Sequence, residues 1–147
     1  MSHVSLFSAS AIPAATIDAY LAADYTVFAA EPFVLDIGHA SSELARWFKL
    51  NRTDSAAFIT AGNPLGEPTS NSENQAAQQQ LLARIKADGL PYLDGEGGDP
   101  SGQWPGEPSL LVFGISLEAA QKLAGEFRQN GFVYAGSDAT PRLILLR

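Results

Sequence analysis

Two short, almost unbroken apolar runs constrain the fold of this chain more than any other feature of its sequence. They cover residues 56–61 and 109–113. A strand with one solvated face alternates apolar and polar residues, whereas a strand buried on both faces reads as a continuous apolar run. Both runs therefore predict central strands of a sheet. Such a sheet has to be covered, which predicts helices packed on it.

Hydrophobic periodicity predicts the remaining elements. Apolar residues spaced three and four apart predict helices over residues 13–23, after Ser41 or Ser42, over 70–88 and over 117–129. Strand-like runs lie at 25–29, 33–37, 91–93, 132–135 and 143–146. This order predicts one α+β domain over residues 1–147, with a mixed, largely antiparallel sheet of about five to seven strands and helices packed on it. Residues 1–11 are predicted to be a flexible N-terminus.

Composition and charge exclude several classes of function. The 147-residue chain contains no cysteine, which excludes disulfides, thiolate catalysis and cysteine-bound zinc. Its formal net charge is −7 and its nine Lys and Arg residues are scattered, so binding to nucleic acid is not expected. No apolar stretch approaches the roughly 18 residues that span a bilayer, and the N-terminus resembles a secretory signal only weakly. We therefore expect a cytoplasmic protein that does not bind membranes.

An acidic, Gly- and Pro-rich loop over residues 94–108 is the first candidate site. It carries Asp94, Glu96, Asp99, Trp104 and Glu107. A compact domain rarely keeps a long structureless loop without a function, so the segment is predicted to be a functional or ordered loop. Its carboxylates resemble a calcium loop, but the EF-hand pattern fails at its sixth and twelfth positions, and no metal site is expected. Trp104 either floors a pocket, anchors a protein interface or packs on the core.

A second candidate site follows the apolar run at residues 56–61. Thr60 and Asn63 lie at the end of this run, and Asn74 lies in the first turn of the next predicted helix. In α/β folds, ligands often bind beyond strand ends and beside a helix N-terminus. The alternative is that Asn63 only forms an Asx turn. Ser70 and Glu73 match a capping box and are assigned to capping the helix.

A nucleophile elbow is considered at residues 114–118 and rejected. The segment Gly-Ile-Ser-Leu-Glu lacks the last glycine of that motif. The only histidines are His3 and His39, so none follows Ser116 and the hydrolase order of the triad is impossible. Ser116 is therefore predicted to be a helix N-cap.

Five segments, taken together, resemble a bacterial family catalogued as domain of unknown function 3293. They are AFITAGNP at residues 57–64, SEN at 72–74, GEGGDP at 95–100, WPGEPSLLVFG at 104–114 and FRQN at 127–130. The resemblance extends over about residues 12–146 and implies no known activity. It draws Gln129 into the set of candidate residues. Members of the family often carry a bulky aromatic residue before the Asn-Pro pair, where this chain has Gly62.

Two functional hypotheses follow from the sequence. The first is a binding module without a cofactor, whose cleft at the strand ends and the 94–108 loop holds a small polar ligand or a protein partner. The second is an enzyme that uses carboxylates as general acid and base, with or without Mg²⁺. The residues that we expect to contact a ligand are Thr60, Asn63, Asn74, Glu96, Asp99, Trp104, Glu107 and Gln129. We favour the binding module because no complete catalytic set is present in the sequence.

Overall fold

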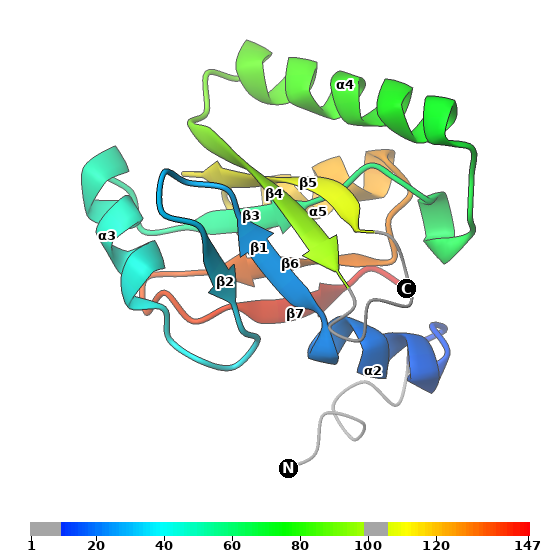
Figure 1. The fold of residues 1–147 in the computed structure, drawn as a ribbon, viewed down its shortest axis with the longest axis horizontal. Helices are drawn as coiled ribbons and strands as arrows, with labels where there is room; N and C mark the ends of the chain where they lie inside the picture. The colour runs from blue at the N-terminus through cyan, green and yellow to red at the C-terminus, as the bar shows by residue number, and fades with distance from the viewer. Residues whose placement is uncertain (1–9, 99–105) are drawn as a thin grey trace.

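The computed structural model describes residues 10–98 and 106–147 (Figure 1). The elements of this part of the chain follow in the order α2 (Ala14–Ala22), β1 (Asp24–Val27), β2 (Phe33–Leu35), α3 (Ser42–Asn51), β3 (Ala56–Ile59), the short 3-10 helix η1 (Pro64–Gly66), α4 (Asn71–Ala87), β4 (Tyr92–Gly98), β5 (Glu107–Phe113), α5 (Leu117–Glu126), β6 (Gly131–Ala135) and β7 (Arg142–Leu145). This order matches the predicted alternation of strand pairs with helices.

The seven strands form one sheet in the order β2-β1-β4-β5-β3-β6-β7. Each neighbouring pair is antiparallel: β1 with β2 and β4, β5 with β4 and β3, and β6 with β3 and β7. The predicted α+β class and the largely antiparallel sheet are therefore confirmed. The prediction of a mixed sheet allowed for a parallel pair, but the described residues form none. The strands that a helix connects are parallel to each other, and they are never neighbours because at least one antiparallel strand lies between them.

Two of these crossovers define the centre of the fold. Helix α4 connects β3 to β4 and passes β5, which lies between them, and α5 connects β5 to β6 and passes β3. In chain order the central unit is β3-α4-β4-β5-α5-β6, and its strands lie in the order β4-β5-β3-β6. This is the strand order of the ferredoxin-like split βαβ arrangement. Strands β2 and β1 extend the sheet at one edge, and β7 extends it at the other.

Hydrophobic clusters cover both faces of the central strands. Ala57, Ile59, Leu110 and Val112 pack with residues of α4 and α5 on one face. Phe58, Leu111 and Phe113 pack with α3 and with β1 and β2 on the other. All four residues of β3 are buried. The prediction that the two apolar runs form central strands buried on both faces is therefore correct.

A smaller cluster fixes the N-terminal helix to the edge of the sheet. Ile12 and Ile17 pack against Leu143 of β7, and the Ser10 hydroxyl donates a hydrogen bond to the Arg147 carbonyl at 2.6 Å. Ser10 and Ile12 thus contact the C-terminal part of the chain, and the flexibility predicted for residues 1–11 stays a prediction. Residues 1–9 of that prediction lie outside the described residues.

Within the predicted long loop over residues 94–108, residues 94–98 belong to strand β4 and residues 107–108 to strand β5. Strand β4 continues to Gly98 and β5 begins at Glu107, with Gly97 paired to Glu107. The glycines that suggested a loop make the pairing possible. A Cβ on Gly95 would lie 2.6 Å from Cε2 of Phe58 and 2.8 Å from the Thr26 carbonyl oxygen, so only glycine fits there. The rest of the loop, residues 99–105, lies outside the described residues.

The four helices of the described residues are all too short or too polar to cross a membrane. The longest, α4, has 17 residues, and it carries Glu73, Arg84 and Lys86.

Candidate functional site

A cleft lies between helix α4 and the β4–β5 hairpin, beyond the end of strand β3. Its volume is about 710 Å³. In Figure 1, α4 crosses above the hairpin and is joined to β3 by the connection that contains η1. The cleft is lined by Phe28, Gly62, Asn63, Pro68, Thr69, Asn71, Asn74, Gln75, Gln78, Gln79, Leu82, Asp94, Gly95, Glu96, Gly106, Glu107, Pro108, Ser109 and Leu110.

The cleft exists because the inner face of α4 changes from apolar to polar along the helix. Leu81 and Ile85 are fully buried in the core under the C-terminal half of α4. One and two turns earlier, the same face presents Gln78 and Asn74, three and seven residues before Leu81, because residues three and seven apart share a helix face. These amides do not join the apolar core, and they line the cleft. The N-terminal half of α4 therefore forms a polar wall.

Asn63 forms hydrogen bonds at one end of the cleft, just after β3. Its backbone has φ 46°, a left-handed conformation that asparagine tolerates better than most residues. The side-chain oxygen accepts hydrogen bonds from the Thr69 N–H at 3.1 Å and from Asn74 Nδ2 at 2.9 Å. The backbone N–H of Asn63 donates to Asn74 Oδ1 at 2.9 Å. Asn63 and Asn74 are thus joined by two hydrogen bonds, which tie the strand end to the first turn of α4.

The fourth bond of Asn63 reaches the carboxylate of Glu107. Asn63 Nδ2 donates to Glu107 Oε1 at 2.7 Å. Glu107 is partly buried at the first residue of β5, and this burial raises the pKa of its carboxyl group, against the lowering effect of the Asn63 bond. Burial also raises the pKa of the nearby Tyr25 hydroxyl, with smaller contributions from Tyr20 and Glu107. Glu107 is thus a titratable group with a raised pKa in a cleft, which is a feature of functional sites.

Two predicted site residues support the cleft from behind and do not line it. The Thr60 hydroxyl donates to the Pro108 carbonyl at 2.8 Å and accepts from the Gly62 N–H at 3.2 Å. The buried Gln129 donates from Nε2 to the Gly62 carbonyl at 3.1 Å. Both side chains therefore hold the backbone of residues 60–62 in place. This is a positioning role for two residues that we expected to contact a ligand.

Two carboxylates stand on the hairpin wall opposite α4. Asp94 and Glu96 pair with Leu110 and Pro108, and Leu110 belongs to the core on the α4 side of the sheet. Residues two apart on a strand share a face, so both acidic side chains point to the α4 side. A Cβ on Gly106 would lie only 2.1 Å from Glu96 Oε1, so the Glu96 side chain lies directly over this glycine. Gly106 is therefore part of the site, because it leaves room for Glu96.

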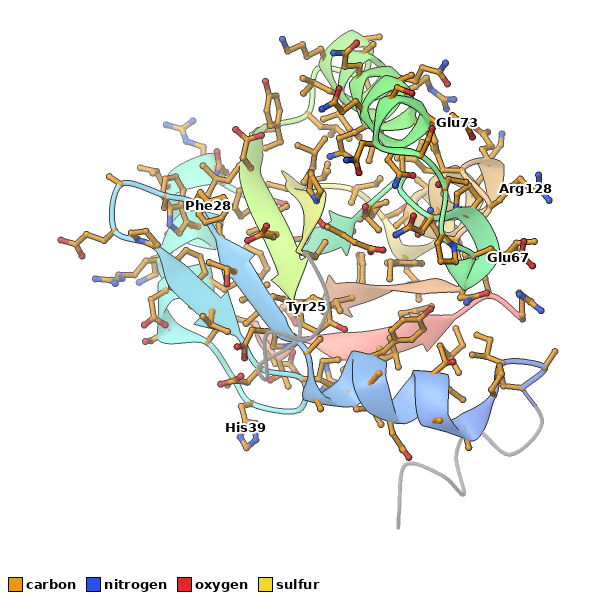
Figure 2. The ribbon with its side chains drawn as sticks, turned by 45° about the vertical axis from the view of Figure 1, so that its right-hand side comes forward. Tyr25, Phe28, His39, Glu67, Glu73 and Arg128 are labelled. Atoms are coloured by element: carbon orange, nitrogen blue, oxygen red, sulfur yellow. The ribbon has the colours of Figure 1, made fainter. Side chains whose placement is uncertain are left out.

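The other predicted residues lie elsewhere. Asp99 and Trp104 lie outside the described residues. Ser70 and Ser116 accept hydrogen bonds from the backbone N–H groups of Glu73 and Ala119 at helix starts, and Glu73 itself is exposed. Figure 2 shows Glu73 on α4, and it shows His39 in the connection from β2 to α3, well away from the cleft.

Sequence reasoning did not select Phe28, Gln75, Gln78 and Gln79, which line the cleft. Phe28 is 49 % exposed and follows β1, and its N–H donates to the Asp94 carbonyl at 2.8 Å (Figure 2). The four-residue spacing from Asn74 through Gln78 to Leu82 carried a signal for the face that lines the cleft, whereas nothing local predicts that Phe28 reaches β4.

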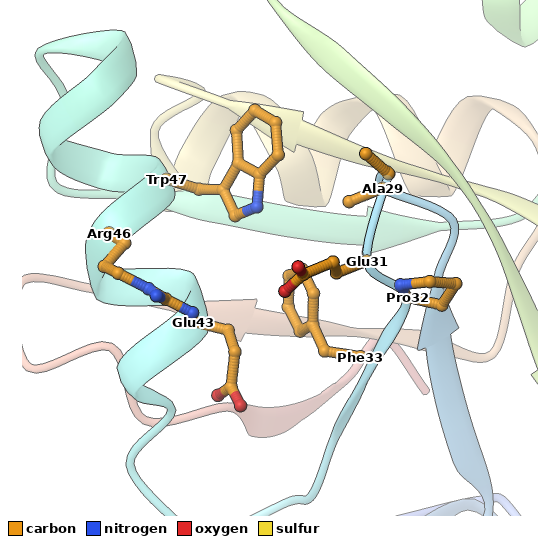
Figure 3. Close-up of a pocket in the computed structure, with 8 residues that line it drawn as sticks. Ala29, Glu31, Pro32, Phe33, Glu43, Arg46 and Trp47 are labelled. Atoms are coloured by element: carbon orange, nitrogen blue, oxygen red, sulfur yellow. The ribbon is translucent and has the colours of Figure 1, made fainter.

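A second, smaller pocket of about 300 Å³ lies between α3 and the connection from β1 to β2 (Figure 3). Trp47 and Phe33 form its apolar wall, and Glu31, Glu43 and Arg46 lie at its rim. Trp47 also stacks on the buried Phe113, at a ring-centroid distance of 6.1 Å. None of the predicted site residues lies in this pocket, so the cleft at α4 is the stronger candidate.

No group of three or more His, Cys, Asp or Glu residues within 10–98 and 106–147 is arranged to hold a metal ion. Asp94, Glu96 and Glu107 line the cleft as separate carboxylates.

The fold and the cleft define a small α+β protein with a ferredoxin-like centre, a two-strand extension and a polar cleft under the crossover helix α4. A family model described as "Protein of unknown function (DUF3293)" matches residues 59–131. The match confirms the family recognised from the sequence, over a shorter stretch than the residues 12–146 that we expected. It contains every residue that lines the cleft except Phe28. Comparisons with curated proteins and with solved structures found no match.

Proposed function

We propose that this protein is a binding module that holds a small polar ligand in the cleft between α4 and the β4–β5 hairpin. The observation that carries this proposal is the polar wall that α4 forms. The side-chain amides of Asn74 and Gln78, on the inner face of the helix, line a cleft of about 710 Å³. Pockets for small molecules have volumes of about 300–1,000 Å³ and combine apolar surface with a few placed polar groups.

The lining residues supply both kinds of surface. Leu82, Leu110 and Pro108 give the cleft an apolar floor, and the Asn63–Asn74 pair holds one end of it rigid. A cleft whose polar groups are already fixed by hydrogen bonds costs less to order when a ligand binds. A small ligand suits such a preformed site better than a flexible protein segment does.

A thermal-shift screen with a pair of bulky variants tests the proposal. Gln75 and Gln80 are both exposed on α4, but only Gln75 lines the cleft. Free amino acids, polyamines, nucleosides, sugars and small carboxylic acids form the panel. A compound present at 100 times its dissociation constant adds about 2.7 kcal/mol to the free energy of unfolding.

The expected result is at least one compound that stabilises the wild type and Gln80→Trp but not Gln75→Trp, because the new indole fills the cleft. If every stabilising compound acts equally on both variants, binding occurs elsewhere and the proposal is wrong. If no compound stabilises the wild type, a macromolecular partner becomes the better explanation, and capture of partners from cell extract follows.

A second candidate function is acid–base catalysis on a small polar substrate. Two observations favour it: burial raises the pKa of the Glu107 carboxyl group, and the exposed Glu96 lines the same cleft. Two carboxyl groups that line one cleft can serve as general acid and general base. Metabolite mixtures incubated with the wild type and with Glu107→Gln distinguish the two functions. Turnover that only the wild type supports favours the enzyme, and ligand binding by both proteins without turnover favours the binding module.

A further inference from the structure

We propose that the ligand of this cleft is an organic cation, a primary amine or guanidinium that carries an apolar group. This inference rests on the proposed function and specifies the chemical class of the ligand. Three features of the described cleft support it: the sign of its charges, the position of an exposed aromatic ring, and the apolar surface between them.

The charged side chains that line the described cleft are all acidic. They are Asp94, Glu96 and Glu107, and neither Lys nor Arg is present among the described lining residues. Asp94 and Glu96 are exposed at the mouth of the cleft, on the face of β4 that points to α4. Carboxylates gathered on one wall raise the local concentration of cations and repel anions. A phosphate or carboxylate ligand is therefore disfavoured.

An exposed aromatic ring lies beside these carboxylates. Phe28 is 49 % exposed and lines the cleft, and its backbone is tied to Asp94 by the hydrogen bond from its N–H to the Asp94 carbonyl. An ammonium or guanidinium group is attracted both by a carboxylate and by the face of an aromatic ring. Because Phe28 and Asp94 are joined through their backbones and both line the cleft, one wall of the cleft offers both attractions.

The floor of the cleft accommodates the apolar part of such a ligand. Leu82 of α4 and Leu110 and Pro108 of β5 line it between the amide wall and the acidic wall. A fully hydrated ion such as Na⁺ gains nothing from this surface, whereas an alkyl or aryl amine does. The cleft thus selects a cation with an organic body.

Isothermal titration calorimetry with matched compounds tests this inference. Phenethylamine, hexylamine and agmatine are compared with the neutral 2-phenylethanol and hexanol and with phenylacetate. We expect the cations to bind and phenylacetate not to bind. Raising the salt concentration from 50 to 500 mM should weaken cation binding several-fold, because the mouth of the cleft is exposed to solvent.

Three variants assign the effect to the cleft. Glu96→Gln and Asp94→Asn each remove one charge from the acidic wall but keep an oxygen that accepts a hydrogen bond. Each is expected to weaken amine binding about tenfold, since a charge-assisted hydrogen bond is replaced by a weaker one to a neutral oxygen. Glu67→Gln removes the same charge at an exposed position that does not line the cleft and should change affinity less than twofold. Thermal melts without ligand check that all three variants fold.

The outcomes separate this inference from the proposed function. Neutral compounds that bind as tightly as the amines, and that Gln75→Trp excludes, overturn the cation inference and leave the binding module in place. Amine binding that Glu96→Gln and Glu67→Gln weaken equally reflects the net charge of the protein and also overturns it. If no member of the series binds but another compound of the wider panel does, the cation class is wrong.

Discussion

Asn63 joins three segments that are far apart in the sequence. Its side chain bonds to Thr69 in the connection after η1, to Asn74 in α4 and to Glu107 in β5. Removing the side chain takes away the acceptor of the Thr69 N–H and of Asn74 Nδ2 and the donor to the Glu107 carboxylate. We expect Asn63→Ala to lower the free energy of unfolding by about 2–4 kcal/mol, since each lost bond costs about 1 kcal/mol and left-handed backbone adds roughly 1 kcal/mol for alanine.

Asn63→Gly is the matched control for this substitution. It removes the same side chain but tolerates the φ of 46°. Urea denaturation of both variants separates the cost of the lost hydrogen bonds from the cost of holding alanine in a left-handed conformation. Asn63→Gly should be more stable than Asn63→Ala by about 1 kcal/mol. Equal stabilities would mean that the left-handed conformation is not maintained when the side chain is lost.

Glu107 predicts a specific dependence of stability on pH. Burial raises the pKa of its carboxyl group above the ordinary value of 4.5, so the folded state favours the protonated form. Its favourable contribution is therefore complete below pH 4.5 and is lost as the pH rises through the raised pKa. Glu107→Gln stays neutral and can still accept the Asn63 bond. We expect the variant to gain stability relative to the wild type between pH 4.5 and 7, by about 1.4 kcal/mol for each unit by which the pKa is raised.

Urea denaturation at several pH values measures this gain. The exposed Glu67→Gln serves as the control, and its difference from the wild type should stay nearly constant over the same range. A Glu107→Gln difference that is equally flat, or that has the opposite sign, would show that burial does not control this carboxyl group.

Sequence reasoning identified much of the candidate site at the level of residues. Asn63, Asn74, Glu96 and Glu107 were selected, and all four line the cleft. They were found because Asn63 ends an apolar run and Asn74 opens a helix, and these are local signals. Thr60 and Gln129 were also selected, but they bond to the backbone behind the cleft. Phe28 was missed because its position depends on the pairing of β1 with β4. These two strands are about seventy residues apart in the sequence, and no local pattern predicts that they pair.

The β4–β5 hairpin provides a prediction at the level of elements. Gly95 is buried between Phe58 and β1, and a Cβ there would lie 2.6 Å from the ring and 2.8 Å from the Thr26 carbonyl. We expect Gly95→Ala to destabilise the protein by about 1–3 kcal/mol, because the added methyl overpacks a site walled partly by backbone. Gly98→Ala in the same strand meets nothing within 4 Å and should change stability by less than about 0.5 kcal/mol. Thermal and urea denaturation of the pair check this, and equal effects would mean that β4 does not pack on Phe58.

The same strand explains where the prediction of elements was incomplete. All α-helices and strands of the described chain were expected, because each carries its own hydrophobic period or apolar run, whereas the 3-10 helix η1 was not expected. Strand β4 was expected only at residues 91–93, whereas it extends from Tyr92 to Gly98. Its last residues are glycines and acids, a composition that local patterns assign to a loop. The packing of Gly95 against Phe58, which is a tertiary contact, makes them a strand.

At the scale of the whole molecule, β3 and β5 belong to two cores at once. Consecutive residues of each strand point to opposite faces, so Ala57 and Val112 contribute to the core under α4 and α5, while Phe58 and Leu111 contribute to the core under α3. The order of the strands in the sheet could not be predicted from the sequence, because α4 and α5 each pass over a strand that joins the sheet through another connection. The sharing of the central strands leads to a prediction about cooperativity.

Neither core can lose its packing without disturbing the strands that support the other, so we expect the molecule to unfold in a single transition. Leu44 of α3 and Leu81 of α4 are both fully buried, one in each core. Leu44→Ala and Leu81→Ala should each cost about 2–5 kcal/mol. Because the two sites share no cluster, the costs in the double variant should add to within about 0.5 kcal/mol.

Fluorescence and far-UV circular dichroism measure this cooperativity together. Trp104→Phe leaves Trp47 as the single tryptophan, and Trp47 packs on the α3 side of the sheet against Phe113. In a cooperative molecule, Leu81→Ala shifts the Trp47 transition as far as it shifts the circular dichroism transition, although Leu81 lies on the opposite face. A Trp47 transition that responds to Leu44→Ala but not to Leu81→Ala would show that the two faces unfold separately. In that case α4 could detach from the sheet while the rest stays folded, and the cleft beneath α4 would open by local unfolding of its own helix.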